Sequence, residues 1–563
     1  MFSQGLAISE RCAGDARGRL SSWQYTYITS ILIMSSVARS IVGMRDLWHP
    51  LVLSRSLTTS AATHQVTAAG AAAAAAEKRN LEPRPVSEVP GPRVLPFLGS
   101  LHSMIFNRSF NSSNIHLYFK KLIEDYGPIV KFVAPFTPPM VFVANPYDAE
   151  TLVRATMDNP IRNSFESFKK IRKDAVDNYF ENKTGILTEN GEEWWRVRSQ
   201  VQTSMMRVKE VVAYLPVMDQ ISLEFMDRIA SLQSQFGEMP SDFQNEMYKW
   251  ALESVGSVAL NRRLGCLDPN IAPDSEPMRM ISHANEFFTA LNDAEFSAHL
   301  WEVFPTPTFR KLKKTHQEFL VIADKNIRET EAALLAQEPS DDQELTLMEG
   351  LLLKPGLSRK DVVTLILDML FAGIDTTSHT LGFVLYLLAR NPEVQTRLQE
   401  EVDTVLGDHK GPLTHHHLAK LHYLKAVIKE SMRLLPTVLG ITRTLDKELV
   451  ISGYLIPKGW SVMTLSMMMG WDESLFPQAK EFLPERWLRN KSLGTIHPYA
   501  TFPFGAGTRM CIGRRIAEQE MYTFLARAMQ RFTIDYKYED IEVVCRLVFS
   551  SATPLKFSVT ERR

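Results

Sequence analysis

Cysteine is scarce in this chain of 563 residues and never occurs as a close pair. The cysteines stand at distant positions, namely Cys12, Cys266, Cys511 and Cys545. Because no Cys-x-x-Cys spacing occurs, the sequence argues against a disulfide framework and against a structural zinc site. This usage fits a reducing compartment, and it leaves single thiols available for chemistry.

An excess of charge of one sign is also missing. Lys and Arg number 63, Asp and Glu number 64, and the formal net charge is −1. Without a basic surplus we expect no nucleic-acid partner. The apolar share of 45% and the charged share of 23% are ordinary for a globular protein and argue against extensive disorder.

The first 60 residues are poor in acidic residues and rich in Arg and Ser, which is typical of an organelle transit peptide. Leu20 to Ala38 carries no charge and has about the length of a membrane span. That stretch nevertheless contains seven Ser and Thr residues, which disfavour insertion. The pattern predicts a removed mitochondrial presequence over residues 1–60, and a signal anchor for the endoplasmic reticulum is the open alternative.

An alanine-dominated run at residues 68–76 follows, and prolines at positions 83, 85, 90 and 92 come after it. We interpret residues 61–84 as a low-complexity linker. Prolines fix φ and stop helices, so they predict a stiff, extended entry to the folded domain. No repeat or second linker follows, and residues 85–563 are therefore predicted to form one large unit.

The periodicity predicts a mainly α fold with a smaller β portion. Residues 130–143 have the pattern of strand and turn, and residues 146–435 are mostly helical. Short β-rich segments are expected at residues 441–466 and again after residue 532.

The longest helical pattern runs from Ser358 to Arg390, about 50 Å at 1.5 Å per residue. It is apolar on nearly all sides, which predicts a buried helix. Its middle nevertheless holds Gly373, Asp375 and Thr376. A glycine inside a helix costs about 1 kcal/mol relative to alanine, and a buried carboxylate needs a partner or a shifted pKa. Either a flat group lies against the helix at Gly373 and a proton path ends at Asp375 and Thr376, or the helices simply pack closely.

Residues 502–513 read Phe-Pro-Phe-Gly-Ala-Gly-Thr-Arg-Met-Cys-Ile-Gly, and a helix is expected to follow. A cysteine just before a helix has its thiolate favoured by the helix dipole and by free backbone N–H groups. The glycines allow the backbone to turn close to a ligand. Arg509 adds a positive charge that can meet a carboxylate.

This loop resembles the haem-binding signature FxxGxRxCxG of the cytochromes P450, through Phe504, Gly507, Arg509, Cys511 and Gly513. The resemblance covers about residues 85–560 and implies the cytochrome P450 fold. It also implies a haem b cofactor (iron protoporphyrin IX) with the Cys511 thiolate as axial ligand of the iron.

Further motifs follow in the order of that family. Residues 372–377 resemble its oxygen-activation motif, which implies catalytic roles for Asp375 and Thr376 and a haem contact at Gly373. Glu430 and Arg433 resemble its ExxR pair, which the family locks with a later arginine, here Arg486. The same spacing occurs at residues 193–196 and 276–279, and only chain order favours Glu430. The lock is expected to stabilise the haem-binding core.

Haem carries two carboxylates, so several donors are required around them. Trp194 and Arg198 resemble the WxxxR pair that contacts a propionate in the family, and Arg443 resembles a second propionate arginine, beside Arg509. Either Arg198 or Arg443 could instead be a solvated surface charge.

Residues 249–254 and 424–430 resemble the animal mitochondrial clan of this family. That resemblance implies an adrenodoxin-like ferredoxin as electron donor, served by an NADPH-dependent ferredoxin reductase. It also implies a peripheral position on the matrix side of the inner membrane. Lys425 and Lys429, one helical turn apart, are predicted to form a basic stripe for the ferredoxin; a plain solvated helix face is the alternative.

The expected activity is that of a haem-thiolate monooxygenase that hydroxylates a lipophilic, steroid-like or xenobiotic, substrate with O₂. Phe371, Val438, Leu439 and Ile441 suggest an apolar substrate cavity. Three alternatives stay open: a microsomal P450 using a diflavin reductase, a haem isomerase or lyase, and a haem sensor without turnover. Such isomerases tend to lack the acid–threonine pair that this chain has.

Overall fold

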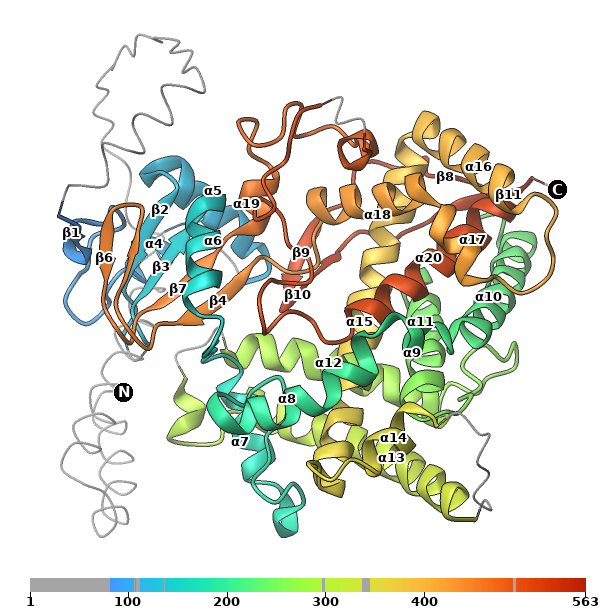
Figure 1. Cartoon of the computed structure of the whole chain (residues 1–563), viewed down its shortest axis with the longest axis horizontal. Coiled ribbons are helices and arrows are strands. Elements are labelled where there is room, and N and C mark those ends of the chain that lie inside the picture. The colour runs from blue at the N-terminus through green and yellow to red at the C-terminus, as the bar shows by residue number, and fades with distance from the viewer. Residues whose placement is uncertain are drawn as a thin grey trace, which may run out of the picture. The chain divides into compact units, whose positions relative to one another are not determined.

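The computed structural model describes residues 82–562, with gaps at residues 106, 108–111, 136, 296–298, 337–344 and 490–492. The predicted presequence (1–60) and almost all of the predicted linker lie outside the described residues. The chain is mainly α-helical with small β-sheets, which confirms the predicted fold class (Figure 1).

The largest sheet has the strand order β2-β3-β7-β4 and joins segments that are far apart in the sequence. Its strands are β2 (Ile129–Phe132), β3 (Met140–Val143), β7 (Ser461–Thr464) and β4 (Ile441–Thr444). Strand β3 pairs in parallel with β7, whereas β2 and β4 are antiparallel to their neighbours. In Figure 1 this sheet lies at the left with α5 (Ile115–Tyr126) and α6 (Pro146–Ala155).

A smaller sheet holds the first described residues of the chain against the folded domain. Strand β1 (Arg84–Pro85) pairs in parallel with β6 (Tyr454–Ile456), which is antiparallel to β5 (Leu449–Ile451). The Arg84 guanidinium lies over the Tyr454 ring at 3.9 Å. Residue 84, which the sequence placed in the linker, therefore already belongs to the sheet.

Helices make up most of the remainder. The α-helices not yet named are α4 (His102–Ile105), α7 (Glu166–Lys173), α8 (Gly191–Met206), α9 (Val208–Val212), α10 (Leu215–Phe236), α11 (Phe243–Ala259), α12 (Glu276–Glu295), α13 (Pro307–Ala336), α14 (Leu347–Leu352), α15 (Arg359–Arg390), α16 (Pro392–Leu406), α17 (His415–Lys420), α18 (His422–Leu434), α19 (Ser466–Gly470) and α20 (Arg514–Arg531). Short 3-10 helices are η2 (Val86–Glu88), η3 (Ser112–Asn114), η4 (Val176–Asn178), η5 (Leu300–Glu302) and η6 (Pro484–Trp487).

Helix α15 begins and ends where the sequence predicted. Ser358 caps its start by accepting a hydrogen bond from the backbone N–H of Asp361, and the Asp361 carboxylate in turn accepts one from the backbone N–H of Ser358. Asn391 ends the helix, and α16 starts at the following proline. Among the described helices α15 is long and apolar enough to span a membrane, but most of it is buried inside the protein. We therefore assign it to the core.

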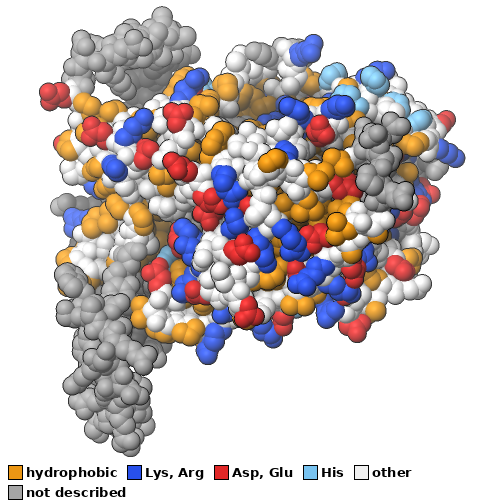
Figure 2. Space-filling model, turned by 60° about the horizontal axis from the view of Figure 1, so that its bottom comes forward, with side chains coloured by type: hydrophobic (Ala, Val, Ile, Leu, Met, Phe, Trp, Pro, Cys, Tyr) orange, Lys and Arg blue, Asp and Glu red, His pale blue; other side chains and the backbone are white. Residues whose placement is uncertain are grey.

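The C-terminal segment is β-rich, as predicted. Strand β8 (Phe532–Asp535) pairs with β11 (Ser558–Glu561), and β9 (Val543–Arg546) pairs with β10 (Val548–Ser551), both antiparallel. Basic and acidic side chains are interspersed over the face shown in Figure 2, in keeping with the nearly zero net charge.

Candidate active site

The loop before α20 is bent tightly around Cys511. The backbone N–H of Cys511 donates to the carbonyl of Phe504 at 2.8 Å. Gly505 and Gly507 have φ of +71° and +74°, a region that other residues rarely adopt. A Cβ at Gly507 would also come within 3.0 Å of a Val153 methyl on α6. The glycines therefore serve both the turn and its close approach to α6.

The Cys511 side chain is accessible to solvent, yet burial among the surrounding residues raises the pKa of its thiol. A side chain that is surrounded by many protein atoms and is still reached by solvent has both properties, the exposure and the raised pKa. The backbone N–H of Gly513 and the charges of Arg198 and Arg514 act in the opposite direction but do not outweigh burial. The helix terminus alone thus does not hold a thiolate here; a bound metal ion deprotonates a coordinating thiol.

Four arginines from separate segments gather beside this loop: Arg162, Arg198, Arg443 and Arg509. Arg509 donates to the Asn190 side chain at 2.7 Å and to the Glu189 carbonyl at 2.6 Å. Arg443 donates to the carbonyls of Thr442 and Ala506 at 2.9 and 3.4 Å.

This arginine cluster lacks anions. No ion pair joins any of the four to a carboxylate within the described ranges, and the Nε atom of each is buried without a hydrogen-bond partner. Burial, together with the charges of the three neighbouring arginines, lowers the pKa of Arg509 to about 8, and the charge of Glu189 offsets only part of this. Buried cations that repel one another need an anion to offset their desolvation. The two propionates of haem would supply two carboxylate anions, each able to accept from more than one guanidinium.

Sequence reasoning found three of these arginines and missed Arg162, which belongs to no motif. It also missed Asn190, the N-cap residue of α8. The Asn190 side chain does not cap that helix. It accepts instead from the backbone of Arg162 at 2.9 Å and from Arg509 at 2.7 Å. That this N-cap asparagine does not cap its helix can be recognised only in the folded chain.

Trp194 is buried, and the Arg509 guanidinium lies 5.0 Å from its ring centre.

Helix α15 is accessible at one place along its buried length. From Asp361 to Ala389 every residue is buried except Ala372, Gly373 and Thr376. Ala372 and Thr376 are one turn apart, and the Thr376 hydroxyl donates to the Ala372 carbonyl at 2.7 Å. Close packing against α11 explains why residue 373 is a glycine, because a Cβ there would lie 2.7 Å from Val255. The structure thus supports close helix packing as the cause of this glycine, although Gly373 shares the accessible surface of α15 with Ala372 and Thr376.

Asp375 is buried on the other side of α15. Its Oδ1 atom has no hydrogen-bond partner. Burial raises the pKa of Asp375 to about 7, although Tyr248 and the charge of Arg546 act to lower it. Both protonation states are therefore accessible near neutral pH, as a group that passes protons requires.

One expected pocket residue belongs to the core instead. Phe371 is fully buried and stacks on Phe319, with ring centres 3.9 Å apart, and on Phe287 at 4.5 Å. It cannot line a substrate cavity. Val438 is 40% exposed, so its side chain is accessible as expected.

Helix α7 is attached to the core at both ends. Glu295 of α12 accepts from the backbone N–H groups of Phe165 and Ser167 at 3.1 and 2.9 Å. Near the other end, Arg172 forms a buried ion pair with Asp368 of α15 at 2.7 Å. Asp368 lies one turn before Ala372, so this pair fixes α7 close to the accessible surface of α15.

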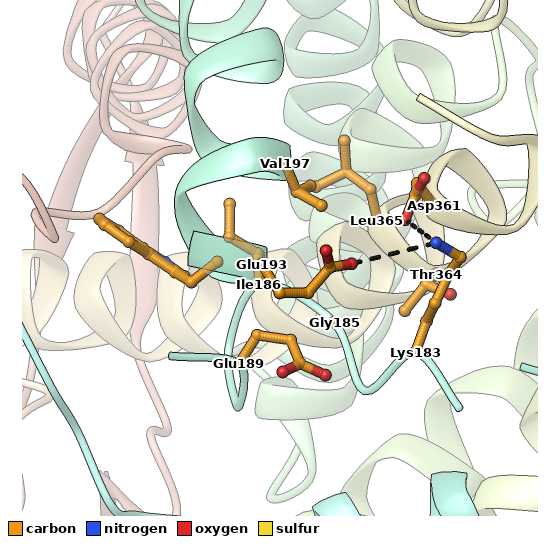
Figure 3. A pocket seen from close by; sticks show the side chains of 10 residues that line it. Lys183, Gly185, Ile186, Glu189, Glu193, Val197, Asp361, Thr364 and Leu365 are labelled. Atoms are coloured by element: carbon orange, nitrogen blue, oxygen red, sulfur yellow. Dashed lines mark ion pairs between the residues drawn. The ribbon is translucent and has the colours of Figure 1, made fainter. Parts of the chain in front are cut away.

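A small pocket lies between the residue 183–189 loop, α8 and the start of α15 (Figure 3). Lys183 reaches across it to Asp361 at 2.9 Å and to Glu193 at 4.0 Å. Burial alone would raise the pKa of Asp361, but hydrogen bonds from Arg196, the Ser358 backbone and Lys183 lower it to about 2. These ion pairs make the pocket a structural junction between the loop and both helices.

The structure brings Glu430, Arg433 and Arg486 together in the interior. Arg433 donates to both oxygens of Glu430, at 2.7 and 2.9 Å, and Arg486 donates to Oε1 at 3.0 Å. Trp487 adds a hydrogen bond of 2.9 Å to the other oxygen. Arg433 also donates to the carbonyls of Gly470, Ala479 and Glu481. The arrangement joins α18, α19 and η6 through one carboxylate.

Lys425 and Lys429 lie near each other on the outer side of α18. Lys429 is exposed, and Lys425 is partly buried with its ammonium 5.7 Å from the Tyr522 ring of α20. Burial lowers the pKa of Lys425, and the charge of Glu518 acts in the opposite direction. Tyr522 belongs to the helix that follows the Cys511 loop, so Lys425 lies against the element that carries this loop.

Comparison with known proteins agrees with this geometry. The family model described as Cytochrome P450 matches residues 89–556. "Probable cytochrome P450 49a1" of Drosophila melanogaster is 32% identical over 526 residues, covering 91% of this chain and 89% of that protein. "Probable cytochrome P450 301a1, mitochondrial" of the same species is 33% identical and covers 84% of this chain and 87% of its own length. "Cytochrome P450 10" of Lymnaea stagnalis is 29% identical over 86% of this chain.

The chain belongs to the cytochrome P450 family, and it has the mainly α fold of that family. It is therefore a cytochrome P450 monooxygenase, and its cofactor is haem with a cysteine ligand to the iron.

Proposed function

We propose that this P450 hydroxylates a lipophilic, steroid-like or xenobiotic, substrate in the mitochondrion with electrons from a ferredoxin. The observation that carries the proposal is the basic pair of α18, in which Lys425 lies against the helix that follows the Cys511 loop. Several relatives carry the word "mitochondrial" in their names, which supports the location. We place the presequence at residues 1–60, the linker at 61–83 and the haem domain from β1 onward, at 84–563.

We assign Cys511 as the axial ligand, and we assign the arginine cluster together with Trp194 to the two propionates. Bound in this way, haem supplies the binding and activation of O₂ for insertion of one oxygen atom into a C–H bond. The protein excludes water, orients the substrate and supplies protons. The arginine cluster would pair with the two propionates, so that neither carboxylate would be buried without a cation.

Two residues of α15 are assigned to proton delivery. Thr376 is partly accessible and lies one turn from Ala372, so its hydroxyl would be available to hold water on the open side of α15. Asp375 has a pKa of about 7 because of burial, which allows it to give and regain a proton at neutral pH. The accessible Val438 and the nearly buried Leu439 supply apolar surface for a lipophilic substrate.

Electron delivery is assigned to the surface formed by Lys425 and Lys429. Both ammonium groups lie within electrostatic reach of each other, and Lys425 contacts α20, the helix that follows the Cys511 loop. An acidic ferredoxin docked there would be held close to the cysteine side of the cofactor. Charges at the rim of such an interface act mainly on encounter and on salt dependence.

The test is reversal of both lysines, Lys425→Glu with Lys429→Glu, in the holoenzyme. We expect a large rise in the apparent KM for ferredoxin and an unchanged substrate-binding spectrum. The matched control reverses Lys120 and Lys121 of α5, which are exposed and form only surface ion pairs. If the two double variants had the same apparent KM for ferredoxin, Lys425 and Lys429 would not form the docking surface. Turnover with a microsomal diflavin reductase and none with ferredoxin would overturn the ferredoxin assignment.

Location is tested on the native protein. N-terminal sequencing is expected to find residues 1–60 removed, and fractionation to find the enzyme on the matrix side of the inner membrane. An intact N-terminus in microsomes would contradict the proposal.

A further inference from the structure

A polar stripe crosses the otherwise apolar contact between α11 and α15. It contains Gln244 and Tyr248 of α11 and Asp375 and His379 of α15, and each pair is one helical turn apart. Asp375, His379 and Tyr248 are 4%, 7% and 7% exposed, whereas Gln244 is partly exposed. The stripe therefore runs from the surface region at Gln244 to the interior at Asp375.

Contacts join three of the four residues, and Gln244 lies against the same stretch of α15. The Tyr248 hydroxyl lies 3.0 Å from Nε2 of His379, and their rings meet edge to face at 5.5 Å. The same Nε2 atom lies 4.0 Å from Oδ1 of Asp375. Towards the surface, the Gln244 side-chain oxygen would be 3.4 Å from a Cβ at Gly382, which is three residues beyond His379. The two helices thus bring Gln244 to the outer end of the pair formed by Tyr248 and His379.

Both ends of the stripe carry a buried polar atom without a partner. Oδ1 of Asp375 and Nε2 of Gln244 are buried and make no hydrogen bond within the described residues. Buried polar atoms that lack a protein partner are usually satisfied by ordered water. The pattern of two such atoms, with a tyrosine and a histidine between them, is that of a water-linked path and differs from that of an apolar helix contact.

The charge states agree with proton transfer through uncharged groups. Burial lowers the pKa of His379 to about 3, so the imidazole is neutral. Burial raises the pKa of Tyr248 well above its usual value, so the phenol keeps its proton. A hydroxyl can accept one proton while it donates its own, and it then changes neither charge nor composition.

We propose that Gln244, Tyr248 and His379 form a buried path along which Asp375 regains a proton from solvent. A proton from water at the Gln244 end moves to the Tyr248 oxygen, and the Tyr248 hydroxyl, which hydrogen-bonds Asp375, passes its own proton to that carboxylate. His379 holds the Tyr248 hydroxyl in position. One proton enters for each proton that Asp375 releases, so the path gains no charge. Tyr248 and His379 are positioning residues, because the structure does not place them against substrate or cofactor.

This inference rests on the proposed role of Asp375, so the experiment separates the two. The variants Tyr248→Phe, His379→Gln and Asp375→Asn are compared in the holoenzyme with its ferredoxin system. The control Tyr386→Phe removes a hydroxyl from α15 that bonds Asp540 outside the stripe. The measurements are product formed per NADPH, the solvent deuterium isotope effect, substrate-binding spectra and the infrared carbonyl band of protonated Asp375.

Tyr248→Phe is expected to lower product per NADPH several-fold and to raise the solvent isotope effect, with unchanged substrate binding. Deuterium exchange into the Asp375 carboxyl, identified by the band lost in Asp375→Asn, should slow by a similar factor. His379→Gln keeps a hydrogen-bonding group and should lie between Tyr248→Phe and the parent, whereas Tyr386→Phe should match the parent. Parent-like coupling and exchange in Tyr248→Phe, with Asp375→Asn uncoupled, would overturn the path alone. Parent-like coupling in Asp375→Asn would overturn the role of Asp375 itself.

Discussion

Oε1 of Glu430 accepts a hydrogen bond of 3.0 Å from Nε of Arg486, a residue 56 positions further along the chain. Both side chains are almost fully buried, with exposures of 0% and 1%. Since Arg433 binds the same carboxylate, removal of Glu430 would leave two buried guanidinium groups without their anion.

Glu430→Gln should therefore be strongly destabilising. Loss of one partner of a buried ion pair costs about 3–5 kcal/mol, which is a large part of the stability of a typical domain. We expect little holoprotein and a much lower urea midpoint. Glu193→Gln is the matched control, because Glu193 and Arg196 have the same spacing but are 43% and 35% exposed. Exposed pairs contribute about 0–1 kcal/mol. Similar urea midpoints for both variants would contradict the predicted lock.

Gly185→Ala should damage the attachment of α7. Gly185 has φ of +89°, and a Cβ there would lie 2.3 Å from Nη1 of Arg172 and 2.6 Å from Oδ2 of Asp368. The substitution would separate a buried ion pair in addition to straining the backbone. Gly453→Ala, at φ +78° with open space around it, measures the strain alone, about 1–2 kcal/mol.

The quantity to compare is the loss in free energy of unfolding that each of the two glycine variants shows. Gly185→Ala should lose several kcal/mol more than Gly453→Ala in urea unfolding, since breaking a buried pair costs about 3–5 kcal/mol. It should also weaken substrate binding, because α7 lies close to the accessible part of α15. Equal losses would show that α7 does not depend on the Arg172–Asp368 pair.

Glu520→Gln should stabilise the protein at alkaline pH. Burial raises the pKa of Glu520 to about 7, and the Ser254 hydroxyl, 2.7 Å from its Oε1, offsets only part of this. The folded state binds the proton more tightly than the unfolded state, so stability falls as pH rises between about 4.5 and 7. At about 1.4 kcal/mol per pKa unit this amounts to roughly 3 kcal/mol.

Because glutamine has no proton to lose, the advantage of Glu520→Gln over the parent should be larger at pH 8 than at pH 5. Urea unfolding at both values measures it, and other titrating groups cancel in the comparison. An advantage that does not change with pH would contradict the buried, proton-binding carboxyl.

Cys511→Ser should keep the fold and lose thiolate ligation of the iron, because a serine hydroxyl is not ionised at neutral pH. The ferrous carbon monoxide spectrum is expected to lose its thiolate-type band while circular dichroism stays that of the parent. Cys545→Ser is the control, since Cys545 is a buried thiol on β9 and does not belong to the Cys511 loop. A retained band in Cys511→Ser would exclude Cys511 as the ligand.

Local chemistry along the chain determined the boundaries of several elements. Ser358 with Asp361 and Asn391 before Pro392 define α15, because capping and proline effects act within a few residues. The glycines and Cys511 define the loop before α20 for the same reason, and spacing alone was enough to relate that loop to a family.

Chain order favoured Glu430 among three similar E-x-x-R spacings, and only the tertiary structure showed its carboxylate buried between Arg433 and Arg486. Glu430 and Glu193 look alike along the sequence, but one meets Arg486 in the interior and the other stays near the surface. It likewise showed that Gly373 lies against Val255, that Phe371 belongs to the core and that Arg162 joins the arginine cluster. The physical reason is common to all of them: desolvation and pairing depend on contacts between distant segments, which local spacing does not encode.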